Sequence, residues 1–175
     1  ETAAIDATVK GGFELKLLQN IMAFTDQLLD GKITYNVAAS GPLDDPDLSG
    51  EVNLKQGRYE NLKVGTLLKD LRLRLRARGD RFELSKLSAN DGQGGSLNGS
   101  GSVNLAEEVA FEANIKIDKF TPASMPMFRG MLSGNLDITG KAKDGGDIVG
   151  KFKILRGEVN IPKNLPPDVA NVDVI

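Results

Sequence analysis

A glycine-rich run and an aspartate-rich run are the segments of this chain whose composition comes nearest to a ligand-binding motif. Residues 92–95 read Gly-Gln-Gly-Gly, a composition found in loops that bind phosphate. No Lys-Ser or Lys-Thr pair and no helical pattern follows, so a turn or sheet bend is favoured over a nucleotide site. Residues 44–47 read Asp-Asp-Pro-Asp and offer oxygen ligands for Ca²⁺. Their spacing is not that of a calcium loop, and Asp and Pro favour a turn here.

The chain contains no cysteine and no histidine. This excludes disulfides, thiol nucleophiles, imidazole bases and zinc sites built from these residues. Carboxylates remain for a glycosidase-like pair, but the two halves of the chain hold no matched pair of acidic positions. We therefore predict a protein that is not an enzyme, with no catalytic residue, no metal site and no cofactor.

Residues 71–78 alternate without a fault between apolar residues and the arginines Arg72, Arg74, Arg76 and Arg78. This period predicts a strand with one apolar and one basic face. The arginine ladder has the chemistry to bind lipid phosphates or an anionic strand through bidentate hydrogen bonds. The alternative is a solvated outer face whose charges discourage aggregation. A net charge of −2 and an aromatic content of 5% argue against a nucleic-acid partner.

Period-two alternation extends over most of the chain and predicts an all-β fold. It divides the chain into roughly eleven to thirteen short strands if glycine and proline clusters are turns. Turns are predicted at Gly11-Gly12, residues 41–47, Gln56-Gly57, residues 79–80 and residues 92–95. A last short strand is expected at residues 169–175.

Residues 17–29 have an apolar spacing that also suits an amphipathic helix. The counterpart of this segment in the second half of the chain, residues 117–128, contains Pro122 and Pro126. Prolines do not fit a helix interior, so we predict an irregular link at both places.

The second half of the chain repeats the first. Residues 50–57 and 150–157 begin and end with glycine and carry apolar residues at matching positions. The match extends upstream with slips of one residue and indicates a repeat of about one hundred residues. We predict one continuous β-groove domain over residues 1–175, with unit one at 13–112 and a partial unit two at 111–175.

Each predicted strand has an apolar face that must be covered. A facing sheet makes that face the core of a β-sandwich, and without one it is an open apolar groove. Gly50, Gly134 and Gly150 stand where alternation predicts a side chain, which indicates a bend or a close approach by another group. Periodicity alone leaves both arrangements open.

Glycine, proline and alternating residues recur in a fixed order, in residues 31–50, Gly57, residues 71–76 and residues 90–101. This order resembles the C-terminal repeat region of the TamB family. There a G-x-L-x-x-P-x-L-x-G unit precedes an x-G turn and, later, a glycine-rich G-x-G-x-L-x-V-x-G strand. In the second unit Gly146 stands where the first has Pro46, so the pattern is degenerate there.

The resemblance implies a long curved β-sheet folded into an apolar-lined groove, the β-taco or repeating β-groove, with essentially no helix. It implies a periplasmic segment of a longer protein that is anchored in the inner membrane by an N-terminal helix. A chain that begins at Glu1 agrees with such a segment. The implied partners are phospholipid acyl chains, the outer-membrane barrel protein TamA and unfolded outer-membrane protein strands.

Two functions follow from this resemblance. One is phospholipid transport between membranes, which uses the apolar inner face. The other is a scaffold for outer-membrane protein assembly, which pairs strand edges with client strands by β-augmentation. The predicted groove-lining residues are Ile33, Tyr35, Val37, Leu48, Val52, Leu54, Leu71, Leu73, Leu75, Phe82, Leu84, Leu97, Val103, Phe111, Ile115, Leu132, Leu136, Ile138, Ile148, Phe152, Ile154 and Val159.

Overall fold

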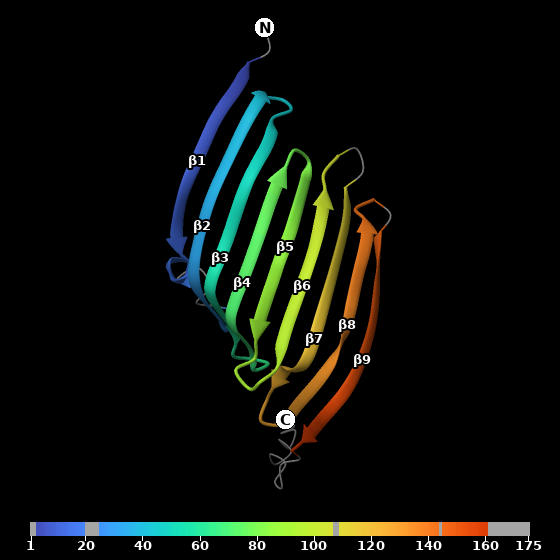
Figure 1. Cartoon of the computed structure of the whole chain (residues 1–175). Coiled ribbons are helices and arrows are strands. Elements are labelled where there is room, and N and C mark those ends of the chain that lie inside the picture. Colours follow the sequence, from blue (N-terminus) through green and yellow to red (C-terminus); the bar gives the residue numbers. More distant parts are fainter. Residues whose placement is uncertain (1–2, 20–24, 107–108, 144, 161–175) are drawn as a thin grey trace, which may run out of the picture.

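The computed structural model describes residues 3–19, 25–106, 109–143 and 145–160. These residues form one antiparallel sheet of nine strands in the order β1 to β9, so each strand pairs with its neighbours in sequence (Figure 1). A 3-10 helix, η1 (Leu15–Leu18), follows β1. The strands are β1 (Ala4–Glu14), β2 (Gln27–Pro42), β3 (Asp47–Asn61), β4 (Thr66–Arg78), β5 (Arg81–Asn90), β6 (Ser96–Asn104), β7 (Ala110–Ser124), β8 (Phe128–Lys141) and β9 (Gly145–Val159). The predicted all-β fold with a curved open sheet is confirmed.

The strands are fewer and longer than predicted, because two of the expected turns lie inside strands. Gly11-Gly12 is part of β1, where these residues pair with Tyr35 and Thr34 of β2. Gln56-Gly57 lies inside β3, where Gln56 adopts a φ of 53° and the chain bulges instead of reversing. The turns predicted at residues 41–47, 79–80 and 92–95 are confirmed. The strand expected at residues 169–175 lies outside the described residues.

The predicted links are also partly wrong. β7 continues to Ser124 and β8 begins at Phe128, so most of residues 117–128 are strand. Pro122 is tolerated because the ladder with β8 shifts between Phe120 and Ala123, where no regular strand hydrogen bond is required of it. Of residues 17–29, the described part contains the end of η1 and the start of β2.

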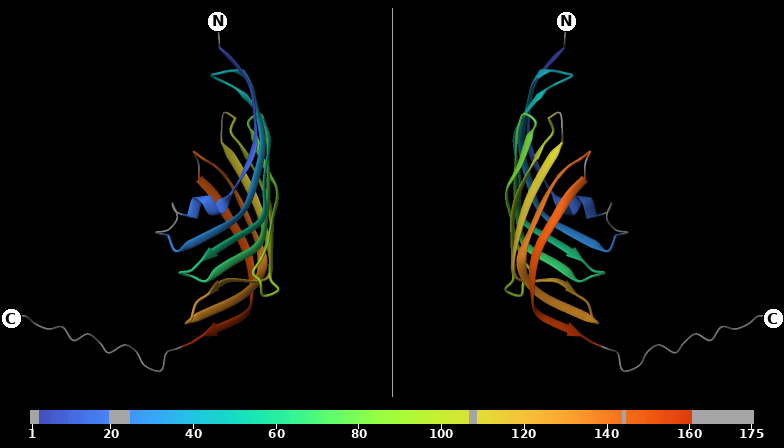
Figure 2. Two further views of the ribbon diagram at one scale, coloured as in Figure 1. Left: turned by 90° about the vertical axis from the view of Figure 1, so that its left-hand side faces the viewer. Right: turned by 90° about the vertical axis from the view of Figure 1, so that its right-hand side faces the viewer.

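Register shifts interrupt the ladders of neighbouring strands towards one end of the sheet. In β2 the shift falls between Asp30 and Lys32. In β3 it falls between Leu54 and Gly57. A Cβ added to Gly31 would lie 2.8 Å from the Cα of Gly57, so the two strands can come this close only because Gly31 has no side chain. Bulges bend the strands that carry them, and the strands swing to one side at this end (Figure 2).

A second cause of curvature is the short β5–β6 hairpin, whose strands have 10 and 9 residues. Beyond its turn the flanking strands meet: Thr66 Oγ1 donates a hydrogen bond to the Pro122 carbonyl at 2.6 Å, and Ser124 N–H donates to the Val64 carbonyl at 3.1 Å. Since neighbouring strands lie about 4.8 Å apart, β4 and β7 are separated by about 14 Å where the hairpin lies between them. A sheet that narrows in this way must curl.

Candidate functional site

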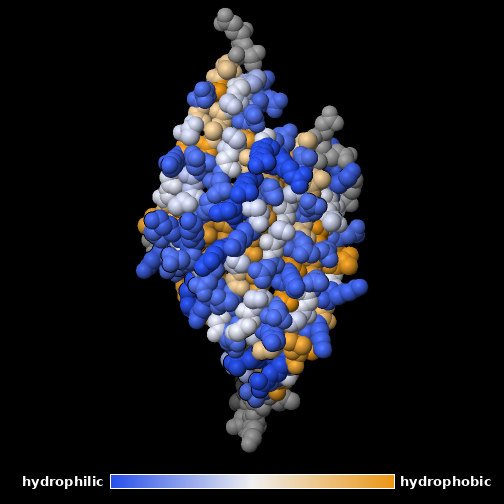
Figure 3. Space-filling model, in the orientation of Figure 1, coloured by the Kyte–Doolittle hydropathy of each residue, from blue (hydrophilic) through white to orange (hydrophobic). Residues whose placement is uncertain are grey.

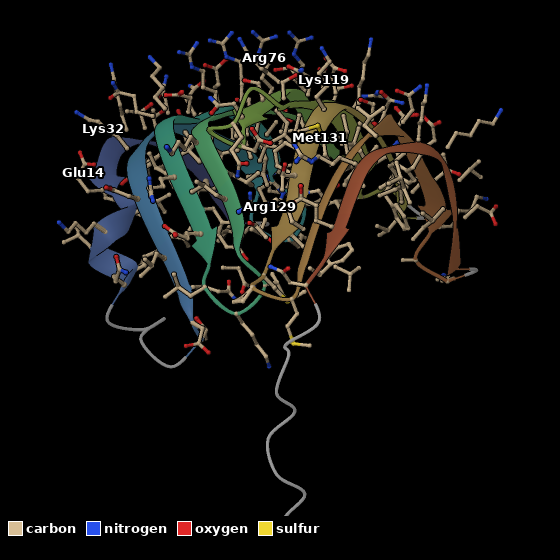
Figure 4. The ribbon with its side chains drawn as sticks, turned by 90° about the horizontal axis from the view of Figure 1, so that it is seen from below. Glu14, Lys32, Arg76, Lys119, Arg129 and Met131 are labelled. Atoms are coloured by element: carbon tan, nitrogen blue, oxygen red, sulfur yellow. The ribbon has the colours of Figure 1, made fainter. Side chains whose placement is uncertain are left out.

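The register of the sheet sorts its side chains onto two faces. Val52 of β3 pairs with Tyr35 of β2 and with Leu75 of β4, which makes an apolar row across the sheet. Glu51, the residue before Val52, pairs with Arg76 and lies on the other face. Figure 4 shows Arg76 pointing away from the arch that the sheet forms. The apolar row therefore lies on the concave side.

The residues predicted to line a groove share this concave face. Cross-strand pairing links them from strand to strand, beginning with Ile33 and Leu54, continuing through Leu75 and Leu84, and ending with Ile138 and Ile148. The structure thus brings together on one surface what the sequence placed in separate strands. Lipid contact by these residues remains a prediction.

The predicted concave-face residues are mostly half-buried in β2 to β8 and exposed in β9. The buried apolar side chains of the described residues are Leu15, Leu54, Ala89 and Phe120. At the β9 edge, Ile148 and Ile154 are 71% and 75% exposed, and Phe152 is 49% exposed. No second sheet covers these side chains within the described part of the chain. The apolar face is therefore a concave surface and not the core of a β-sandwich.

Aromatic rings lie over glycines on the concave face. A Cβ added to either Gly134 or Gly150 would lie 2.6 Å from a ring atom of Phe152. A Cβ added to Gly11 would lie 2.6 Å from the Oη of Tyr35. The glycines thus leave room for the rings to lie along the sheet. This arrangement keeps the surface apolar while leaving the concavity unfilled, which suits a long, flexible apolar ligand.

A buried carboxylate holds the turn between β5 and β6. Asp91 is 1% exposed, and its carboxylate accepts hydrogen bonds from the N–H groups of Gln93 and Gly95, each at 2.8 Å, and of Thr121 at 2.9 Å. Burial raises the pKa of Asp91, but these hydrogen bonds outweigh it, so the pKa is lowered overall. Because two N–H groups of the glycine-rich turn are bound to the protein's own carboxylate, this turn is a structural element.

The convex face carries the arginine ladder and is mainly hydrophilic (Figure 3). Glu51 accepts a hydrogen bond from Asn53 at 2.6 Å and forms ion pairs with Arg76 at 3.2 Å and Arg74 at 3.6 Å. The hydrogen bonds from Asn53 and Arg76, with the charges of both arginines, lower the pKa of Glu51. These groups are solvent-accessible, so the ion pairs add little to stability.

The sequence-based prediction omitted the concave residues of β1 and the end of β7. Val9 and Phe13 continue the apolar rows of β2. Their alternation runs unbroken through Gly11-Gly12 and was the signal that could have identified β1 as one strand. Phe120, only 3% exposed, was assigned to a link because prolines follow it. Asp91 was also missed, because an aspartate before a glycine-rich turn has no distinctive sequence signature.

Comparison with known protein families matches residues 85–175, just over half of the chain, to the TamB C-terminal domain. The chain belongs to the TamB family. The matched region runs from the end of β5 through β9, and it includes residues 90–101 of the resemblance described above. No curated protein and no solved structure matches the chain. None of the described helices has the length and apolar character needed to cross a membrane.

Proposed function

We propose that the concave face of this TamB-family chain holds phospholipid acyl chains and shields them from water during transport between the inner and outer membranes. The observation that carries the proposal is a concave row of apolar side chains that no second sheet covers within the described residues, half-buried in β2 to β8 and up to 75% exposed at Ile154 of β9. Soluble monomers rarely expose contiguous apolar patches above ~300–600 Å². Acyl chains suit this face because they need no hydrogen bonds, and its open side leaves head groups in water.

The family supplies the cellular setting of this proposal. The chain is a periplasmic part of a longer, inner-membrane-anchored protein, it acts without catalysing a reaction, and TamA is its outer-membrane partner. Residues 1–175 make one continuous β-groove in which units 13–112 and 111–175 are repeats. Register shifts at equivalent positions support this repeat: the pairing shifts after Leu54 in β3 and after Ile154 in β9.

Photo-crosslinking on β4 tests lipid binding, because successive residues of this strand face opposite sides of the sheet. A photo-reactive residue at Leu73 or Leu75 on the concave face should capture phospholipid in cells. The matched sites Arg74 and Arg76, on the convex face of the same strand, should not. Equal capture from both faces would refute the proposal.

A scaffold for outer-membrane protein assembly is the second candidate, and β9 favours it. Among the described residues β9 is the last strand of the sheet, and all 15 of its residues are exposed. The backbone groups on its outer side have no partner strand within the described part of the chain, and such groups are what β-augmentation by a client strand requires. Main-chain pairing of this kind does not depend on the apolar side chains of the concave face.

Crosslinking at Lys153 and Lys116 tests the scaffold. Lys153 lies on the β9 edge, whereas Lys116 lies in β7, between two paired strands. If clients add to the edge, a photo-reactive residue at Lys153 captures an unfolded outer-membrane protein and one at Lys116 does not. Capture at neither position, together with lipid capture at Leu73, leaves lipid transport as the function of this segment.

A further inference from the structure

A hollow of about 410 Å³ lies on the convex face beside the bulge of β3. Its polar lining consists of Asn53, Lys55, Gln56, Arg72, Arg74 and Lys86, and Leu54 and Leu73 complete the lining. No carboxylate lines it. All four of its cationic side chains are exposed and come from three adjacent strands.

The cross-strand pairs at this hollow place like charges opposite one another. Arg74 pairs directly with Lys86, and Lys55 pairs directly with Lys32 of β2. Opposed like charges destabilise a sheet. Among the described residues, no ion pair joins Lys55, Arg72 or Lys86 to a carboxylate. At Lys55, Arg72 and Lys86 the repulsion is therefore not offset by an ion pair.

The backbone beside the hollow is strained. Gln56 has a φ of 53°, in the left-handed region, which is strained for a residue with a side chain. The bulge at this position shifts the register between Leu54 and Gly57, and Gln56 itself lines the hollow. Strain of this kind often accompanies binding sites. The strained backbone at Gln56 is evidence for a binding site that does not depend on the charges.

The neighbouring carboxylates have other partners. Glu51 is held by Arg74 and Arg76. Asp70 accepts a hydrogen bond from Asn90 at 2.8 Å. Arg74 contacts Glu51 and Asn53 through Nε, and Arg74 also lines the hollow.

We propose that this hollow binds a phosphate group. The two arginines supply planar pairs of donors that match phosphate oxygens, and the two lysines supply compact positive charges. The phosphate belongs either to an anionic lipid head group or to a free phosphorylated molecule. Because the site lies on the convex face, it is separate from the concave apolar surface and does not depend on acyl-chain binding there.

Two paired substitutions test the site in the 175-residue chain at low ionic strength, where screening is weak. The test variant is Arg72→Gln with Lys86→Gln. The control variant is Arg78→Gln with Arg81→Gln, a directly opposed cationic pair on the same strands and face, next to the turn at residues 79–80. Both variants lose the same charge, and circular dichroism checks that both stay folded.

The first arm titrates each protein with inorganic phosphate, followed by NMR of the arginine Nε–H groups. The second measures co-flotation with phosphatidylglycerol vesicles against phosphatidylcholine vesicles. The test variant should weaken binding at least tenfold and the control variant less than threefold. The charge-conserving variant Arg72→Lys with Lys86→Arg should retain most of the binding.

The two arms identify the source of the phosphate. Saturable binding of inorganic phosphate that is lost in the test variant indicates a free phosphorylated ligand. Binding only to phosphatidylglycerol vesicles, again lost in the test variant, indicates a lipid head group. Equal losses in the test and control variants, or no binding in either arm, overturn the proposal. Lipid capture at Leu75, which does not line the hollow, is unaffected by either outcome, so the concave-face proposal is tested separately.

Discussion

An acidic residue on the concave face should have opposite consequences at two positions that the repeat treats as equivalents. Leu54 of β3 is 8% exposed, whereas Ile154 of β9 is 75% exposed. Leu54→Asp removes a buried side chain, at about 2–5 kcal/mol for the loss of the apolar atoms alone. Burial of an unpaired carboxylate adds roughly 1–3 kcal/mol or more. This approaches the total of ~5–15 kcal/mol that stabilises a typical domain.

Ile154→Asp should cost far less. Full burial of an isoleucine is worth about 1.5–3 kcal/mol, so the quarter of the side chain that is covered contributes less than about 1 kcal/mol. The new carboxylate reaches water and needs no partner. Urea unfolding followed by circular dichroism should therefore show a near-normal midpoint for Ile154→Asp and a strongly lowered one for Leu54→Asp. Lipid extracted from the purified Ile154→Asp chain should nevertheless fall several-fold, because a charge interrupts the apolar surface.

Val149→Asp is the matched control. Val149 lies on the same strand, is 59% exposed and occupies the convex face, where it pairs with Asp137. The new charge repels Asp137, so the control is at least as disruptive to the sheet as Ile154→Asp, yet it should leave the lipid content normal. Unfolding of Ile154→Asp to the same extent as Leu54→Asp indicates a closed core. If the Ile154→Asp chain is folded and its lipid content is normal, the concave face is not the surface that binds lipid.

Three further changes test other parts of the structure. Asp91→Asn should destabilise the chain by about 1–3 kcal/mol in urea unfolding, because the amide cannot accept all three backbone hydrogen bonds. The lowered pKa of Asp91 also predicts a pH dependence of stability. The ionised Asp91 side chain stabilises the fold fully above its unfolded pKa of about 3.9, and this contribution is lost as the pH falls through the folded pKa. An Asp91→Asn chain that loses as much stability in acid as the parent chain contradicts this prediction. Gly150→Val should lift the Phe152 ring off the sheet and lower the free energy of unfolding by about 1–3 kcal/mol in the same assay. It should also reduce lipid capture at Leu73. Unchanged capture would show that the position of the ring does not matter for lipid binding. Glu51→Gln should change stability by less than about 1 kcal/mol, since its ion pairs are exposed; a larger loss means that the convex network is structural.

The faces of the sheet could be predicted from the sequence, because alternation such as that of residues 71–78 depends only on the two-residue period of a strand. The strand bounds could not. Gln56-Gly57 and Gly11-Gly12 look like turns, and only pairing with the neighbouring strands makes one of them a bulge and the other a continuous strand. The sequence also could not predict that the concave face has no covering sheet. The exposure of Ile154 depends on the absence of a covering sheet among the described residues, which periodicity does not reveal.

The burial of Asp91 depends on distant segments. Its partners Gln93 and Gly95 are local, but Thr121 comes from the far end of β7, brought close only because β4 and β7 converge below a short hairpin. The convex hollow likewise lies beside the bulge at Gln56 of β3. Both sites adjoin a departure from regular pairing, and such departures leave little trace in the alternation of residues.

The strand order β1 to β9 has a consequence for how the sheet is made. Every strand of the described chain pairs only with the strands that come just before and just after it, so each hairpin can form from one continuous segment of the chain. Each new hairpin can add to a finished edge as the chain is made, without waiting for a distant segment. The convergence of β4 and β7 is the exception, and it makes their meeting point the step at which a growing flat ribbon acquires its curve.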